Sequence, residues 1–142
     1  MSGALDQLIP HRAPMQWITG LIDCAETTAT ATACFEADDF AVADGRIIET
    51  ALAECMAQTV AAALGRRAQS RAAESAAMEA TAAANGMLVG ISNFKIQSRP
   101  LVGQTLRIEI REQKRLGPMQ LIAGTISCDG LMVASGELSL YA

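Results

Sequence analysis

The chain has 142 residues, of which 51% are hydrophobic and 18% are charged, and its formal net charge is −4 at pH 7. This length and composition suit one globular domain with a single hydrophobic core, and they argue against a disordered or two-domain chain. The negative charge disfavours nonspecific nucleic-acid binding, because neutralising phosphates requires a basic surface.

The cysteines and the apolar segments bear on the cellular compartment. No Cys-x-x-Cys spacing links Cys24, Cys34, Cys55 and Cys128, so we expect reduced thiols in a cytoplasmic protein, with no metal site and no cofactor. The first residues lack the basic segment and apolar run of a signal peptide. The most apolar stretch, residues 51–64, is too short to cross a bilayer comfortably, and we expect no membrane association.

The amino-terminal part of the chain predicts a short helical segment, a loop and two strands. Residues 4–9 fit one or two helical turns, and two prolines then bracket a loop that holds the only histidine, His11. Residues 15–22 and 27–36 are β-branched, aromatic or alternating in polarity, which predicts two strands around a turn near Asp23. The alanines of the second segment fit a helix as well.

Residues 47–65 predict an almost wholly apolar helix. Apolar residues point in nearly every direction around it, which is typical of a helix that is buried on most sides. Its polar residues Thr50, Glu54 and Gln58 follow one another at intervals of four and share one stripe. Gly65 is a natural helix terminator. We therefore expect a buried helix that carries one carboxylate, Glu54, into the interior.

The rest of the chain predicts an alanine-rich extension and then a sheet. Residues 66–85 are read as an exposed helical extension or mobile linker. Four strand-like runs follow, separated by turn-like joints such as Asp129-Gly130: residues 87–97, 105–114, 119–128 and 131–141. Two strands, one helix and four strands predict an antiparallel α+β domain that spans residues 1–142.

Three stretches resemble the hot-dog-fold 3-hydroxyacyl-[acyl-carrier-protein] dehydratases, in which an antiparallel sheet wraps a central helix. The first is Ile9-Pro10-His11-Arg12-Ala13-Pro14-Met15, which is similar to the family motif Leu-Pro-His-Arg-x-Pro-Met/Phe. The second is Ala53-Glu54-Cys55-Met56-Ala57-Gln58, which is similar to the helix motif Glu-x-Met-Ala-Gln. The third is residues 86–106, with Phe94, Lys95, Pro100 and Gly103, which is similar to the family's third strand and the Pro-Gly-type turn after it. The chain looks closest to the branch found in aryl-polyene-type biosynthetic clusters. The resemblance implies a hot-dog dimer that acts on thioesters of acyl carrier protein or coenzyme A.

One segment departs from this pattern. Typical members of the group have a His-Phe-Pro-Gly segment upstream of the helix glutamate, where this chain reads Phe40-Ala41-Val42-Ala43-Asp44-Gly45-Arg46. The usual catalytic histidine is missing. The resemblance implies that the two catalytic residues come from different subunits, so a homodimer could not supply the histidine. A heterodimer with a histidine-bearing hot-dog protein could supply it.

Dehydration of a 3-hydroxyacyl thioester requires a base for the α-proton, an acid for the departing hydroxyl and hydrogen-bond donors for the carbonyl. Glu54 is the candidate acid/base. The alternative is a structural carboxylate that pairs with an arginine or caps a backbone group, and the Glu-x-Met-Ala-Gln resemblance favours catalysis. His11 is a second catalytic candidate, although a histidine between two prolines more often fixes a loop.

Other residues are candidates for binding. Gln58 could orient Glu54 or a water, or could form hydrogen bonds at a dimer seam, which we favour slightly. Met15 and Met56 are possible walls of an acyl tunnel, and Thr50 shares the stripe of Glu54. We expect Cys55 to be a small core thiol.

A carrier protein is acidic in general, so it would need a local basic surface on this chain. Lys95 and Arg99 are the docking candidates, and Arg66, Arg67 and Arg71 also follow the helix. Ordinary solvated surface charges explain each of them equally well.

Three functions are compatible with these features. The first is a dehydratase-like protein that acts on acyl-carrier-protein thioesters in fatty-acid, polyene or polyketide-type biosynthesis. The second is a thioesterase in which Glu54 activates water. The third is a catalytically silent subunit of a hot-dog heterodimer. The sequence does not define the length or identity of the acyl chain.

Overall fold

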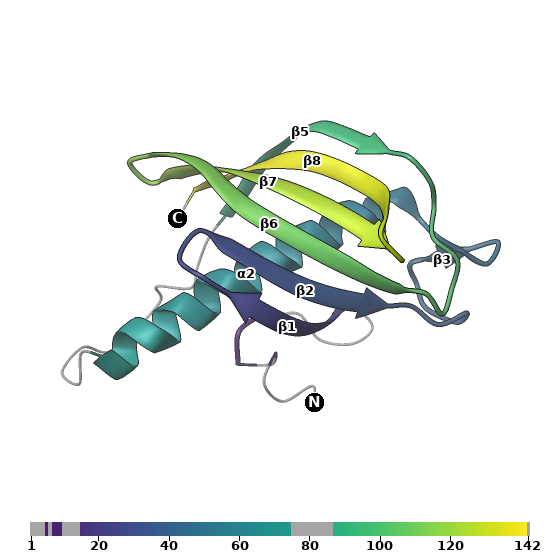
Figure 1. The fold of residues 1–142 in the computed structure, drawn as a ribbon, viewed down its shortest axis with the longest axis horizontal. Coiled ribbons are helices and arrows are strands. Elements are labelled where there is room, and N and C mark those ends of the chain that lie inside the picture. The colour runs from purple at the N-terminus through teal and green to yellow at the C-terminus, as the bar shows by residue number, and fades with distance from the viewer. Residues whose placement is uncertain (1–4, 6, 10–14, 75–86, 142) are drawn as a thin grey trace.

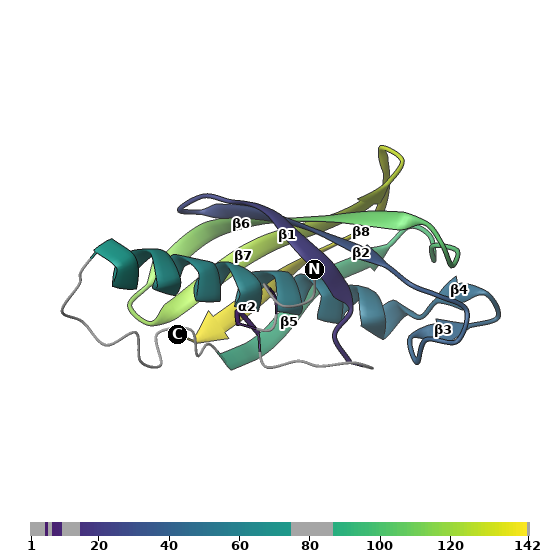
Figure 2. The ribbon, with the colours of Figure 1, turned by 90° about the horizontal axis from the view of Figure 1, so that it is seen from below.

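A six-stranded antiparallel sheet curves around one long helix in the computed structural model, which describes residues 5, 7–9, 15–74 and 87–141 (Figure 1). The elements in chain order are β1 (Ile18–Cys24), β2 (Thr28–Cys34), β3 (Val42–Ala43), β4 (Arg46–Ile47), α2 (Glu49–Glu74), β5 (Met87–Ile96), β6 (Thr105–Leu116), β7 (Met119–Cys128) and β8 (Leu131–Tyr141). The strand order is β1-β2-β6-β7-β8-β5, and β3 and β4 form a separate hairpin. Helix α2 lies across one face of the sheet (Figure 2).

The predicted α+β class is confirmed, and the four carboxy-terminal strands lie close to their predicted bounds. The alanine-rich segment that also fitted a helix is strand β2. Its alanines at positions 29, 31 and 33 are at most 2% exposed. They pair across the ladder with Ile110, Ile108 and Leu106 of β6, which are also buried. Small residues beside large ones let the helix approach the sheet closely.

Helix α2 differs from its prediction at both ends. It begins at Glu49, because Ile47 belongs to β4, and it runs through Gly65 to Glu74. Gly65 does not end the helix. A Cβ atom at this position would lie 2.7 Å from the carbonyl oxygen of Leu8, so this glycine permits a close approach of two backbones. The predicted extension is thus helical as far as residue 74, and residues 75–86 lie outside the described residues.

A second glycine permits close contact between the helix and the sheet. A Cβ atom at Gly124 of β7 would lie 2.8 Å from the sulfur of Met56. Met56 is only 1% exposed, so its side chain fills the space above this strand. No helix in the described part of the chain combines the length and apolar character needed to span a bilayer.

Candidate functional site

Glu54 lies in a groove between helix α2 and the pair of strands β5 and β8. The groove is apolar apart from this carboxylate, and its lining residues are Glu54, Ala57, Val60, Ala61, Leu64, Leu88 and Leu140. Glu54, Ala57, Ala61 and Leu64 are separated by three or four positions, so they follow one face of the helix. Glu54 is partly buried and stands at the amino-terminal end of this stripe. The groove therefore offers one acid/base group beside an aliphatic channel.

Gln58 holds this carboxylate through a network that also fixes strand β1. Its Nε2 donates to Oε1 of Glu54 at 3.2 Å and to the carbonyl oxygen of Met15 at 2.7 Å. Its Oε1 accepts from the backbone N–H groups of Trp17 (2.9 Å) and Ile18 (3.3 Å). A glutamine amide has two N–H donors and two acceptor positions, and all four are used here. This leaves one orientation for the amide and directs an N–H toward Glu54.

This network bears on the two predicted roles of Gln58. The side chain is completely buried and is not part of the lining of the groove, and its hydrogen bonds include one to Glu54, as the first of those roles requires. It is a positioning residue for Glu54. Strand β1 begins at Ile18, later than predicted, because the backbone just before it forms hydrogen bonds with the side chain of Gln58.

Cys55 follows Glu54 but does not share its groove. The thiol is completely buried, and burial, followed by repulsion from the Glu54 charge, raises the pKa of Cys55. A raised pKa keeps the thiol protonated at neutral pH, so it is a poor nucleophile.

The segment that lacks the usual histidine forms the β3–β4 hairpin, which precedes the helix. Asp44 and Gly45 make its turn with positive φ angles of 54° and 74°. Arg99 fastens the hairpin: its Nε donates to the carbonyl oxygen of Ile47 at 3.0 Å, and its Nη2 donates to that of Ala43 at 3.3 Å. The Nη1 of Arg46 donates in return to the carbonyl oxygen of Arg99 at 2.8 Å. The hairpin is thus well fixed but carries no histidine.

The remaining predicted substrate contacts lie elsewhere. Met56 packs in the core against Gly124 of β7, Met15 is 46% exposed and Thr50 is exposed on the first turns of the helix. None of these three belongs to the lining of the groove in the described structure. Met15 is connected to the site through its carbonyl group, which accepts from Gln58.

The other candidates are also separated from Glu54 or undescribed. His11 lies outside the described residues. Lys95 of β5 pairs with Ser135 of β8. The neighbours of Ser135, Ala134 and Gly136, are buried, so Lys95 lies on the outer face of the sheet, away from the helix. Arg99 binds backbone carbonyls of the hairpin, a role that the sequence did not predict. Strand alternation in β8 could have identified Leu140 as an inward residue, but its position beside Glu54 depends on the tertiary fold.

The sheet wrapped around a long helix, with one carboxylate of that helix in a groove, defines the chain as a hot-dog protein, as the resemblance predicted. The chain belongs to the ApeP-like family: the model of this family, described as ApeP dehydratase, matches residues 3–142. A comparison with curated protein sequences gives no match.

Solved structures share this fold. The chain is similar to one from the dehydratase heterocomplex ApeI:P of Xenorhabdus doucetiae, with 25% identity and a TM-score of 0.82 over 96% of this chain and 89% of that one. The PaaI protein of the E. coli phenylacetic acid degradation operon shares the fold at 11% identity, with a TM-score of 0.66 over 86% and 81% of the two chains. A hypothetical thioesterase from Streptococcus pneumoniae also shares it, at 10% identity and a TM-score of 0.65 over 86% and 83%.

Proposed function

We propose that this protein is the glutamate-bearing half of a heterodimeric dehydratase that acts on 3-hydroxyacyl thioesters of an acyl carrier protein. The observation that carries the proposal is the pairing of Glu54 with the apolar groove, in a dehydratase-family chain whose hairpin carries no histidine. In this arrangement the acyl chain lies along the groove, and the 3-hydroxyl group faces Glu54.

The reaction assigns one proton transfer to Glu54. A base removes the proton from C2, the electrons of that bond form the C2–C3 double bond, and the C3–O bond breaks. Protonated Glu54 donates its proton to the departing oxygen, so that water leaves. The Gln58 N–H stabilises the resulting carboxylate, because a hydrogen bond to a charged oxygen is stronger than one to a neutral oxygen. A proton must then return from the base to Glu54.

The base for C2 is assigned to a second subunit. The hairpin of residues 42–47 precedes the helix, and none of its side chains is a histidine; its only ionisable groups are Asp44 and Arg46, and both residues are exposed. A histidine on the corresponding hairpin of a different hot-dog protein would complete the acid/base pair. The similar chain from Xenorhabdus doucetiae comes from a heterocomplex, which supports this assembly.

Strand β5 supplies an edge for such a partner. It pairs with β8 on one side only and ends the order of the sheet. Its side chains are unusually apolar for an edge: Met87, Leu88, Val89 and Ile91 are 65%, 39%, 51% and 45% exposed. Long apolar edge strands invite pairing with another chain. Because Leu88 also lines the groove, a subunit paired here would lie beside the acyl channel.

The test mixes the chain with a histidine-bearing hot-dog protein from the same genome and a 3-hydroxyacyl thioester loaded on acyl carrier protein. The complex is expected to form the enoyl thioester, detected by its absorbance and by the loss of one water in mass. A partner variant with its hairpin histidine replaced by alanine serves as the control. Release of free carrier thiol without enoyl product would assign a thioesterase instead and would overturn the proposal.

A further inference from the structure

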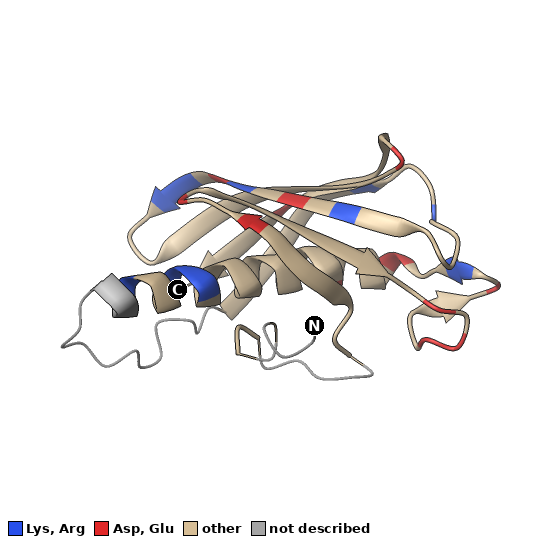
Figure 3. Cartoon of the chain, turned by 60° about the horizontal axis from the view of Figure 1, so that its bottom comes forward, with Lys and Arg blue, Asp and Glu red and all other residues tan. Residues whose placement is uncertain are grey.

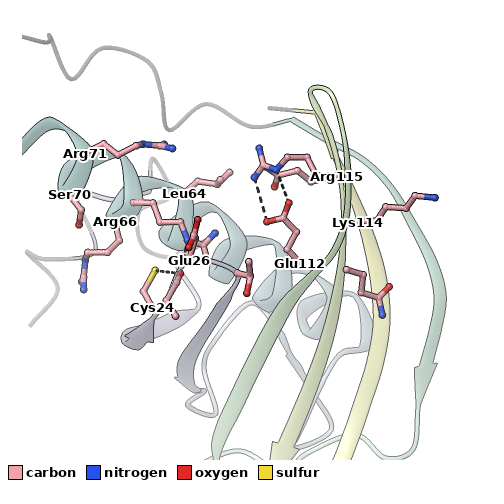
Figure 4. A pocket seen from close by; sticks show the side chains of 14 residues that line it. Cys24, Glu26, Leu64, Arg66, Ser70, Arg71, Glu112, Lys114 and Arg115 are labelled. Atoms are coloured by element: carbon pink, nitrogen blue, oxygen red, sulfur yellow. Dashed lines mark hydrogen bonds and ion pairs between the residues drawn. The ribbon is translucent and has the colours of Figure 1, made fainter. Parts of the chain in front are cut away.

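The groove beside Glu54 meets a second, larger groove at Leu64. Leu64 lines both, and it is the last residue of the apolar stripe along the helix. The second groove lies between the carboxy-terminal part of α2, the turn between β1 and β2, and the ends of β6 and β7, with a volume of about 1150 Å³. The two grooves therefore adjoin at Leu64, which Figure 4 shows among the side chains that line the larger one.

The second groove is basic, in contrast to the whole chain. Five of the eleven lysines and arginines line it, with only two of the fifteen acidic residues, which gives it a formal charge of +3 on a chain of net charge −4. The basic residues are Arg66, Arg67, Arg71, Lys114 and Arg115, and the acidic ones are Glu26 and Glu112. Figure 3 shows basic segments on the helix end and on the nearby β6–β7 hairpin, and acidic segments around β3 and β4 at the other end of the molecule.

These cations differ in what they already bind. Arg67 donates to the carbonyl oxygens of Ala25 and Thr28, at 2.9 and 3.2 Å. Arg115 donates to Glu112 at 2.7 Å, and this hydrogen bond raises the pKa of Arg115. Arg71 has no hydrogen bond or ion pair within the described part of the chain, and in Figure 4 it extends from the helix toward the hairpin that carries Arg115. Arg66 and Lys114 likewise have none among the described residues, but in Figure 4 Arg66 points away from the hairpin and Lys114 points away from the helix. Arg71 is thus the cation that faces the space between the helix end and the hairpin.

The helix places Arg71 in line with the apolar stripe. It follows Leu64 by seven residues, or about two turns, so the two side chains share a helix face. Ten residues separate Glu54 from Leu64, which corresponds to about 15 Å and to roughly twelve methylene groups of an extended acyl chain. A longer chain would pass Leu64 and bring its far end toward Arg71.

We propose that the two grooves form one acyl site, in which Leu64 marks the end of the apolar part and Arg71 receives an anionic end group, such as a carboxylate, on long acyl chains. This inference rests on the proposed function, because it assigns the acyl chain to the groove beside Glu54. A methyl end would leave apolar surface exposed to a charged, open groove, whereas a carboxylate there gains a charge-assisted hydrogen bond.

The test compares 3-hydroxyacyl thioesters on acyl carrier protein as substrates of the complex of this chain with its histidine-bearing partner. Two pairs are used, one of about eight carbons, which ends before Leu64, and one of about twenty-two carbons, which passes Leu64 and covers the further seven residues, or about 10 Å, to Arg71. Each pair differs only in a methyl or carboxylate end. The long carboxylate-ended chain is expected to have a KM roughly fivefold lower than its methyl-ended match, as for one partly exposed ion pair. The short pair is expected to show no such preference.

Arg71→Gln is expected to abolish the preference within the long pair. Arg111→Gln, which removes an exposed charge on the outer face of β6, is expected to retain it. Leu64→Phe is expected to raise the KM of both long substrates relative to the short ones, because the larger side chain narrows the passage between the two grooves.

Equal KM values within the long pair, or a preference that survives in Arg71→Gln, would overturn the inference. Turnover of the short methyl-ended substrate tests the proposed function separately. If none of the substrates is turned over, both the proposed function and this inference are refuted.

Discussion

Helix α2 and the β3–β4 hairpin are neighbours in the chain, but they differ in what they contribute to the site. The helix carries Glu54, directs a Gln58 N–H toward it and extends an apolar groove from it. The hairpin is held as firmly, through Arg99 and backbone hydrogen bonds, yet it carries no histidine. Under the proposed function, this chain contributes its helix to a shared site, and a partner contributes the histidine that the fixed hairpin does not carry.

The largest effect is expected from Glu54→Gln. If the helix contributes the acid, loss of its proton should lower the dehydration rate of the heterodimer by roughly 10²–10⁴-fold. The fold should remain, because a glutamine oxygen still accepts from Gln58. Glu49→Gln, at the exposed first turn of the same helix, is the matched control and should leave the rate unchanged. Full activity of Glu54→Gln would show that the helix is not the catalytic half.

Gln58→Ala should damage both the fold and the site. It leaves backbone groups of Met15, Trp17 and Ile18 without their partner; the Ile18 N–H is buried and the other two groups are partly buried, and a buried group without a partner costs about 1–3 kcal/mol. We expect the free energy of unfolding to fall by about 3 kcal/mol in urea titrations. Gln58→Glu keeps an acceptor for Trp17 and Ile18 but repels Glu54, so it separates the two roles. A loss well under 1 kcal/mol in Gln58→Ala would contradict the network described here.

Gly65→Ala tests whether this glycine serves packing or helix termination. Alanine favours a helix by about 1 kcal/mol over glycine, so an open position would be stabilised. Here the added methyl group would meet the Leu8 backbone at 2.7 Å, and we expect a net loss of about 2 kcal/mol in thermal unfolding. Ser70→Ala, at an exposed position of the same helix, should change stability by no more than about 0.5 kcal/mol. Stabilisation by Gly65→Ala would refute the close approach.

The smallest effect is expected from Arg99→Gln, which loosens the hairpin. Loss of its hydrogen bonds to Ile47 and Ala43 should cost about 1 kcal/mol of unfolding free energy. Because this hairpin supplies no catalytic group, the rate of the folded complex should change by less than a factor of two. A much larger loss of rate at unchanged stability would show that the hairpin, or Arg99 itself, takes part in the reaction.

The sequence predicted the elements whose patterns are local. Alternation identified β6, and turn residues placed β7 and β8 at their observed bounds. The same reasoning failed at Gly65, because the reason for a glycine there is a contact with Leu8, distant in the chain. It also missed the β3–β4 hairpin, whose two-residue strands are too short to show a pattern.

The candidate site was predicted only in part. The helix motif identified Glu54, and the spacing of four placed Gln58 beside it, as the hydrogen bond between them shows. The other partners of Gln58 are backbone groups of β1, which no side-chain pattern could indicate. The groove depends on Leu88 and Leu140 from strands that follow the helix, so it emerges only when the sheet closes around α2.

The most direct test of the half-site is a titration of this chain against its histidine-bearing partner, with the total protein concentration held constant and enoyl formation as the readout. If the glutamate comes from this chain and the histidine from the partner, we expect negligible rates for either chain alone and a maximum at equal amounts of the two, with one heterodimer visible by analytical ultracentrifugation. Full dehydratase activity of this chain alone, unchanged by addition of the partner, would contradict this assignment.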